Sequence, residues 1–370
     1  MQQFISRLFK RLLKSWSWIL LIVGAIVVKW VSLYPNWIEH NYTYGIYPVI
    51  AKVQRFLLGW IPFSIGDIFY LFLILVLIFR VVKFFRLLIQ RKLNRFYFAA
   101  ALQQLIFLIL FVYVFFNVLW GLNYNRQGIA QQLQLKVQKY STEDLDTLVN
   151  ILHGHLNNQA ALITKENRDS FHRKSPLFAG AAQAFETGAP QYNFLTYKPK
   201  SVKPSLFSYL GNYLGFQGYY NPFSGEAQVN TFTPQSLHPF VATHEIAHQL
   251  GYAKENEANF VGFLACRTHP SPVFKYSVYF DMYNYASREL ARRDTALYRN
   301  YQQSLHKQVT DDIEEYRAYL RKYRNPIETV VNWGYGHFLK VNNQPSGFET
   351  YSEVVAWLIA YYKKYGKEVI

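Results

Sequence analysis

Residues 70–78 read Tyr70-Leu71-Phe72-Leu73-Ile74-Leu75-Val76-Leu77-Ile78, an apolar run with no charged side chain. The run is the centre of a segment from about residue 61 to 79, and crossing a bilayer takes about 20 mostly apolar residues. Two similar segments flank it, at about residues 16–33 and 99–120. Helices that are apolar on every face need apolar surroundings on every side. Residues 1–126 are therefore predicted to form a membrane anchor with three transmembrane helices.

The net charge of +16 is concentrated in this anchor. Residues 1–126 hold 14 of the 39 Lys and Arg residues but only two of the 23 acidic ones, Glu39 and Asp67. The basic residues lie before the first span and after the second, whereas the connection between the first two spans has only Lys52 and Arg55. Because positive flanks stay in the cytoplasm, we expect a cytoplasmic N-terminus and place the chain after about Asn123 on the other side. The soluble part has no basic recognition motif, so we expect no nucleic-acid binding.

Two features of the anchor allow a second interpretation. The basic N-terminus resembles that of a signal peptide, but no small-residue cleavage site follows the first span, which favours an uncleaved anchor. Asp67 is a costly residue inside a span and could mark a function. Its position near the outer end of the second span favours plain solvation at the interface.

Beyond the anchor, polar and apolar residues mix, which predicts a helix-rich α+β domain at residues 127–370. Ser141 or Thr142 is a suitable N-cap for a helix to about residue 163, since Glu143 and Asp144 follow in its first turn. Polarity alternates over residues 227–233 and predicts a strand. Further helices are predicted at about residues 176–185, 239–252, 255–267, 273–292, 310–322, 327–340 and 352–364. The predicted fold class is therefore mainly α.

The chemistry-bearing stretch of this domain is His244-Glu245-Ile246-Ala247-His248. On a helix His244 and His248 lie one turn apart on a single face, where both imidazoles can bind one ion. Glu245 projects beside that face and can take a proton from a water molecule at the ion. Zinc favours imidazole and carboxylate, and its catalytic sites use three protein ligands. We therefore predict a Zn²⁺ site with Glu245 as general base. The alternative is a helix whose histidines only form hydrogen bonds in the core.

A third ligand is expected on the following helix, which offers Glu255 and Glu257. Glu255 shares a face with the small residues Ala258 and Gly262, which would allow close packing on the histidine helix. We favour Glu255 and leave Glu257 open. Asn259, one turn after Glu255, is placed to hydrogen-bond a ligating histidine from behind.

The two segments together resemble the gluzincin branch of the zincin metallopeptidases. The resemblance rests on His244 to His248 followed by Glu255-Asn256-Glu257-Ala258-Asn259, which is similar to the setting of the glutamate ligand in that branch. It implies a zincin-like fold, zinc held by His244, His248 and Glu255, and peptidase activity. The whole chain also resembles a bacterial family of membrane proteins defined by a domain of unknown function and grouped with zinc peptidases. That likeness implies the bacterial inner membrane, with the catalytic domain on the periplasmic side.

Further site residues are less sharply indicated. Gly225 to Phe232 is predicted as an edge strand that could bind the substrate backbone. In the similar enzymes a Tyr or His donates to the developing oxyanion, and Tyr335, His337 and Tyr351 are candidates here. His238 and His269 are expected to be surface or loop residues rather than ligands.

The sequence thus predicts a membrane-anchored zinc metallohydrolase that cleaves a peptide or protein substrate. The alternative is a catalytically silent module, tethered to the membrane, that binds zinc or regulates a partner. Intact Glu245 favours the enzyme. A cavity that opens at the metal would distinguish the two.

Overall fold

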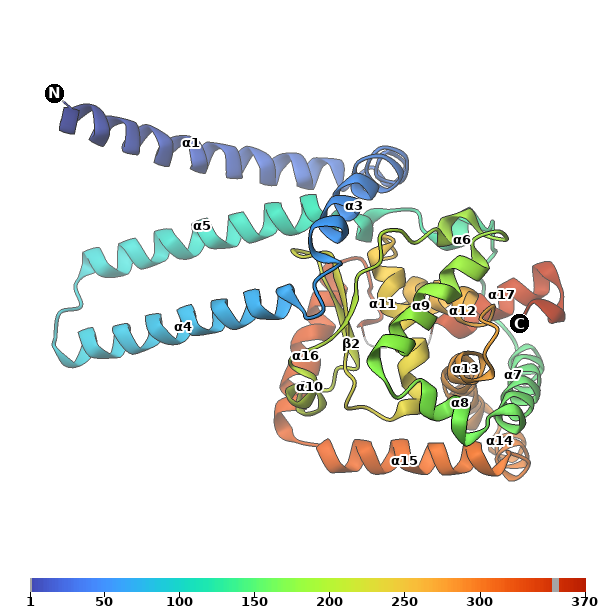
Figure 1. Ribbon diagram of the computed structural model, residues 1–370. Coiled ribbons are helices and arrows are strands. Elements are labelled where there is room, and N and C mark those ends of the chain that lie inside the picture. The colour runs from blue at the N-terminus through green and yellow to red at the C-terminus, as the bar shows by residue number, and fades with distance from the viewer. Residues whose placement is uncertain (1, 348–352) are drawn as a thin grey trace.

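The structure is a computed structural model that describes residues 2–347 and 353–370, and it is mainly helical. Figure 1 shows three long helices projecting from one side of a helical body: α1 (Gln2–Val31), α4 (Ile65–Ile89) and α5 (Arg95–Leu119). Helix α1 packs against α5. Arg80 of α4 donates to Gln104 of α5 at 2.8 Å. These helices form the predicted anchor region.

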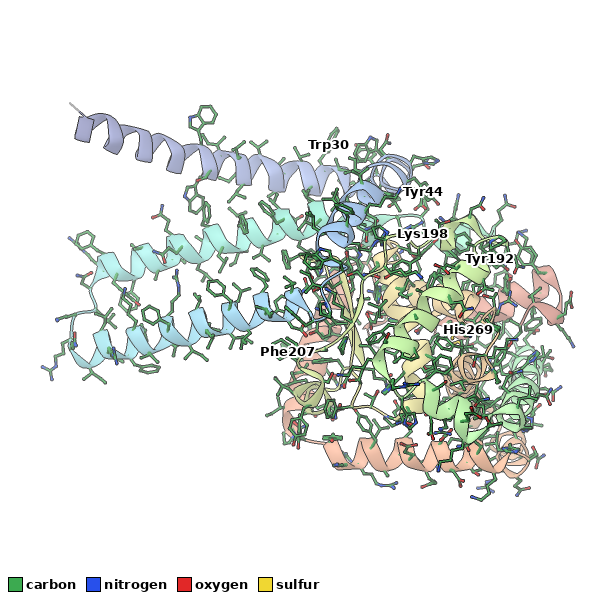
Figure 2. All side chains as sticks on the ribbon, in the orientation of Figure 1. Trp30, Tyr44, Tyr192, Lys198, Phe207 and His269 are labelled. Atoms are coloured by element: carbon green, nitrogen blue, oxygen red, sulfur yellow. The ribbon has the colours of Figure 1, made fainter. Side chains whose placement is uncertain are left out.

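Two of the three predicted spans correspond to single helices. α4 and α5 have windows of mean hydropathy 2.5 and 2.3 with no residue buried inside the protein, and Figure 2 shows their side chains standing outward. The first predicted span is confirmed only in part. Trp16–Val31 is long and apolar enough to cross a membrane only when it is taken together with Pro35–Leu58, from which it is bent by 100°. The described chain therefore has two helices suited to cross a membrane, or three if the bent pair is one span. Membrane association follows from these helices.

The connection between α1 and α4 is folded rather than a plain loop. It contains α2 (Pro35–Trp37), the π-helix η1 (Ile38–Ile46) and α3 (Tyr47–Leu58). Arg55, expected to be one of two charges of a loop, is 4% exposed. Ile38, Tyr42 and Tyr47 pack with Trp120 and other residues in a small core between the anchor and the body. The connection thus belongs to the helical body.

The main part of the helical body follows η2 (Gly121–Asn125). Its central helices, α11 (His238–Gln249) and α12 (Glu255–Cys266), are buried at every residue because other helices and the sheet enclose them. The predicted helix from Thr142 is present, and Ser141 and Asp144 form a reciprocal capping box at its start. The remaining elements are α6 (Ile129–Gln132), α7 (Thr142–Leu162), α8 (Lys165–Ser170), α9 (Lys174–Gly188), η3 (Asn193–Leu195), α10 (Ser208–Leu214), η4 (Gln235–Leu237), α13 (Pro272–Arg293), α14 (Thr295–Gln303), α15 (Lys307–Tyr323), α16 (Pro326–Val341), α17 (Val354–Tyr365) and η6 (Lys367–Val369).

A three-stranded sheet lies against α11 in the order β1-β3-β2. β1 (Val202–Pro204) runs parallel to β3 (Glu226–Val229), and β2 (Gly218–Asn221) runs antiparallel to it. The predicted strand is therefore shorter than expected. The expectation that Gly225 to Phe232 forms an edge strand is wrong, because β3 is paired on both sides. Among the described residues, β1 and β2 are the two edge strands, and β2 makes the more extensive contact with α11.

Asp67 corrects a second expectation. It lies in the first turn of α4, but it is fully buried rather than solvated at the interface. Its carboxylate accepts hydrogen bonds from the Leu206 backbone N–H at 2.6 Å, the Ser205 hydroxyl at 3.2 Å and the Tyr219 hydroxyl. The start of α4 is therefore fixed to the body by a buried carboxylate.

Candidate metal centre

Helix α11 presents two imidazoles toward one point. His244 and His248 lie on successive turns, with ring centroids 4.7 Å apart and ring planes at 88°. The helix is buried because Val241, Ile246 and Ala247 pack into the core around them. It ends before Gly251, whose φ of +89° is a left-handed conformation that glycine adopts readily. The turn at Gly251 reverses the chain into α12.

Of the two glutamates at the start of α12, the structure brings Glu255 to the histidines. Its Oε2 lies 3.2 Å from His244 Nε2 and 3.4 Å from His248 Nε2, and the three ligand atoms lie within 4.8 Å of one another. Glu257 lies elsewhere, against Gly128, with its Oε1 3.6 Å from Lys254 Nζ.

Close packing of α11 and α12 makes this arrangement possible. A Cβ added to Gly262 would lie 3.2 Å from the His244 backbone nitrogen, so a side chain there would press directly on the histidine backbone. The small residue expected on this face is therefore at the contact between the two helices.

Three hydrogen bonds hold the outer atoms of the ligands. His244 Nδ1 is 2.8 Å from Asn259 Oδ1, and His248 Nδ1 is 2.7 Å from the Tyr252 carbonyl oxygen. A carbonyl oxygen only accepts, so His248 Nδ1 carries a proton, and Nε2 is the ring nitrogen that faces Glu255. Tyr335 donates to Glu255 Oε1 at 2.6 Å. Each ligand is thus oriented from behind, with Nε2 or Oε2 turned inward.

The electrostatics of the cluster suit a cation. Burial alone would raise the pKa of Glu255, but the charge of the neighbouring His248 and the close approach of both rings hold that pKa well below its ordinary value. Burial lowers the pKa of His248, yet the charge of Glu255 outweighs it and raises that pKa to about 9. Oε2 of Glu255 is buried without a hydrogen-bond partner among the described residues. A divalent cation between the three atoms would satisfy this oxygen and replace the proton, so the residues fit a metal ion.

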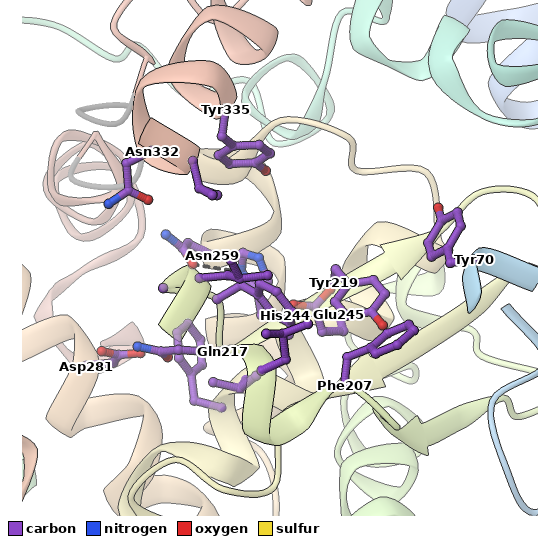
Figure 3. Close-up of a pocket in the computed structure, with 18 of the residues that line it drawn as sticks. Tyr70, Phe207, Gln217, Tyr219, His244, Glu245, Asn259, Asp281, Asn332 and Tyr335 are labelled. Atoms are coloured by element: carbon purple, nitrogen blue, oxygen red, sulfur yellow. Dashed lines mark hydrogen bonds between the residues drawn. The ribbon is translucent and has the colours of Figure 1, made fainter. Parts of the chain in front are cut away.

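Glu245 lies beside the cluster and faces a cavity of about 660 Å³ (Figure 3). Burial raises the pKa of Glu245 to about 8. Gly218 of β2 lies directly against it, because a Cβ at that position would be 2.5 Å from Glu245 Oε1. His244 and Glu245 both line the cavity, so a molecule in it reaches the metal position and the carboxylate together.

The other expected residues are distributed unevenly. Tyr335 of α16 lines the cavity, whereas His337 is exposed and its Nδ1 contacts the Trp333 carbonyl oxygen at 2.8 Å. Tyr351 lies outside the described residues. His238 and His269 are 5% and 2% exposed, so neither is a surface residue. His269 lies in the loop between α12 and α13, as one form of the expectation had it, and neither histidine is among the three clustered ligands. His238 lies at the start of α11, where its Nε2 is 2.9 Å from the Thr233 carbonyl oxygen. The ring of His269 stacks on Phe274. These contacts hold both side chains in the interior.

Several cavity residues were not anticipated. Gln217, just before β2, lines it together with Gly218 and Tyr219 of β2, and Asp281 of α13 lines it as well (Figure 3). Burial raises the pKa of Asp281 to about 7. The glycine before two tyrosines was the one local signal of a close approach in the β2 segment. For Asp281, nothing in the neighbouring sequence indicates a cavity.

A protein-family model described as "Protein of unknown function (DUF3810)" matches residues 42–359. Since the match covers most of the chain, the protein belongs to this family. The comparisons with curated proteins and with solved structures gave no match. The predicted membership of a family defined by a domain of unknown function is thus confirmed. The predicted kinship to zinc peptidases stays a prediction.

Proposed function

We propose that this DUF3810 protein is a membrane-anchored, zinc-dependent hydrolase of zincin-like fold that cleaves peptide or other amide bonds. The observation that carries the proposal is the convergence of three ligand atoms, from His244, His248 and Glu255, within 4.8 Å beside a cavity lined by Glu245. Two imidazoles and one carboxylate are a ligand set typical of catalytic zinc, which keeps its fourth position for water or substrate.

Zinc bound there would supply a Lewis acid that polarises the substrate carbonyl and the attacking water. Glu245 then takes one proton from that water as its oxygen bonds to the carbonyl carbon. The C–N bond breaks, and Glu245 passes the proton to the leaving amine, so that water and an amide become a carboxylic acid and an amine. The Tyr335 hydroxyl lines the cavity and donates to Glu255 Oε1 at 2.6 Å, and it is our choice for the group that turns its proton to the carbonyl oxygen as charge develops there.

The edge strand supports an extended substrate. β2 pairs only with β3 among the described residues and its first residue, Gly218, touches Glu245. A peptide that adds to this edge as a further strand would carry its backbone past the general base. We assign this role to β2 in place of the 225–232 segment.

We further propose that the N-terminus is cytoplasmic and that the body lies on the outer side of a bacterial inner membrane. The basic residues support this orientation. Arg80, Lys83, Arg86, Arg91 and Lys92 all lie on or just after the end of α4 that points away from the body.

Metal analysis and peptide hydrolysis on the purified full-length protein test the proposal. We expect one zinc per chain and zinc-dependent cleavage of a peptide mixture. Glu245→Gln should keep the zinc but lose hydrolysis, and His244→Ala should lose both. Glu257→Gln is the matched control, since it changes a buried acid of α12 that lies outside the metal cluster, and it should keep both properties.

Two results would overturn the proposal. One is a protein without bound divalent metal, and the other is unchanged hydrolysis in the Glu245 variant. Stoichiometric zinc without hydrolysis of any amide would instead favour the silent zinc-binding module. The open cavity beside Glu245 speaks against that alternative, because a silent site has no need of access.

A further inference from the structure

The cavity beside Glu245 is walled in part by a candidate transmembrane helix. Tyr70, Leu73 and Ile74 of α4 line it, and all three lie within the apolar part of that helix. At 1.5 Å per residue they lie about 8 to 14 Å beyond the start of α4. A helix used only as an anchor would expose these residues to lipid alone. The cavity therefore extends from the candidate metal centre to the apolar part of α4.

The rest of the wall is suited to hydrocarbon. Between α4 and the metal position the lining consists mainly of apolar residues from α10 and its neighbours, Phe207, Leu210, Leu214 and Phe216, with Phe240 and Val241 of α11. No Lys or Arg lines the cavity in the described part of the chain, so nothing there matches a phosphate or carboxylate headgroup. A volume of about 660 Å³ lies within the range of small-molecule sites.

The surface next to the cavity is also apolar. On α16, Ile327, Val330, Trp333 and Val341 recur at helical spacing on one face and are 62%, 67%, 68% and 84% exposed. Helix α16 contacts α10, whose Tyr209 is 60% exposed. Figure 1 shows both helices on the side of the body from which α4 and α5 project. An apolar helix face on that side is placed to enter the membrane interface.

From the α4 wall, the apolar lining and the α10–α16 surface, we propose that the substrate is an N-acylated peptide or amine drawn from the membrane. Its hydrocarbon chain lies between α4, α10 and α11, and the amide next to that chain is the bond that Glu245 helps to cleave. Water adds to the acyl carbon, the C–N bond breaks, and the products are a fatty acid and a free amine. This inference rests on the proposed function and specifies its substrate class.

The test uses full-length protein in nanodiscs and a series of N-acyl dipeptides with chains of 2, 4, 6, 8 and 10 carbons. Burying one more CH₂ corresponds to about a fourfold change in an equilibrium or rate ratio. We expect kcat/KM to rise about fourfold per added CH₂ until the cavity is filled. Binding to the Glu245→Gln protein should tighten in parallel, which gives a readout apart from turnover.

Leu73→Trp is the decisive variant, because it places a large ring in the α4 wall. It should weaken binding and cleavage of the ten-carbon substrate at least tenfold more than it weakens those of the two-carbon substrate. Leu75→Trp is the matched control on the same helix, since Leu75 does not line the cavity and is 57% exposed. It should behave as the unmodified protein.

Failure of this inference is distinct from failure of the proposed function. Zinc-dependent hydrolysis that needs Glu245 but shows no dependence on chain length would overturn the substrate class and leave the hydrolase standing. Equal effects of the two tryptophan variants would overturn the cavity assignment. If nothing is hydrolysed, binding of the acyl dipeptides to the Glu245→Gln protein tests the substrate class. Equal affinity at all chain lengths would refute the inference.

Discussion

Replacing Asn259 with alanine removes the group that orients His244 from behind. Asn259 Oδ1 lies 2.8 Å from His244 Nδ1, and both residues are buried. Without this acceptor, the hydrogen bond that orients the ring with its Nε2 toward the proposed metal is lost. Removing one partner of a buried hydrogen bond costs about 1–3 kcal/mol. At 1.4 kcal/mol per tenfold change, this is a loss of about 5- to 150-fold in metal affinity.

We therefore expect Asn259→Ala to raise the Kd for zinc by about 10- to 100-fold, the range found for other residues that support metal ligands. Asn259→Asp keeps an acceptor at the same position and should restore an affinity close to that of the unmodified protein. The measurement is a competitive titration of the full-length protein against a chromophoric zinc chelator at fixed pH.

Asn256→Ala is the matched control on the same helix. The Asn256 side chain donates to Glu353 at 2.7 Å and accepts from the Glu257 backbone N–H at 2.8 Å. Neither hydrogen bond involves His244, His248 or Glu255. It should leave the zinc affinity unchanged. An Asn259→Ala affinity within twofold of the unmodified value would refute the reasoning, as would an equal loss in both alanine variants.

Two further predictions concern Tyr335 and His238. Tyr335→Phe removes a hydrogen bond to the Glu255 carboxylate and should lower kcat about 10- to 100-fold while one zinc per chain remains bound. Unchanged turnover would exclude Tyr335 as the donor to the carbonyl oxygen. Burial lowers the pKa of His238 from about 6.5 to about 4. Between these pH values the unfolded chain binds more protons than the folded protein, so the free energy of unfolding falls as the pH drops through that window, by about 3 kcal/mol in total. In thermal unfolding at pH 7 and 4.5, His238→Gln should lose less Tm than the unmodified protein, and equal losses in the two proteins would contradict this assignment.

The features that the sequence predicted correctly depend on nearby residues. The helix from Thr142 follows from Ser141 and Asp144, which cap it within one turn. The two imidazoles face one point because four residues on a helix bring them to one side. Glu255 was favoured over Glu257 on the small residues of its face, and the close contact of Gly262 with α11 is consistent with that argument.

The incorrect expectations for the edge strand and for Asp67 depended on residues far apart in the chain. β3 becomes the central strand only because β1, more than twenty residues earlier, pairs with it. Asp67 is buried because Leu206 and Tyr219 come back to it from the body, and a hydropathy pattern contains no information on such a return. Tyr335 and Glu255 are 80 residues apart in the chain, so the sequence could give Tyr335 only as one of three candidates.

Residues that precede the soluble domain also supply hydrogen-bond donors to the end of α11, the helix that carries His244 and His248. The last carbonyls of a helix lack partners within it. At the end of α11, Trp120 donates to the His248 carbonyl oxygen at 3.0 Å, and Arg55 and Tyr47 donate to that of Gln249 at 3.2 and 2.8 Å. Arg126, held by a buried ion pair with Glu39, donates to the Gly251 carbonyl oxygen at 3.1 Å.

All four donors precede residue 127, the predicted start of the soluble domain, so a cut at that point would remove every one of them. The spans therefore do more than keep the body near the membrane. Because the segments that follow α1 and α5 bind the end of α11 itself, hydrogen bonds rather than a flexible linker fix the candidate centre relative to the long apolar helices. A fixed distance matters little for a soluble peptide, which can approach any exposed site. It is required for a substrate whose hydrocarbon chain stays in the membrane while its amide reaches the metal.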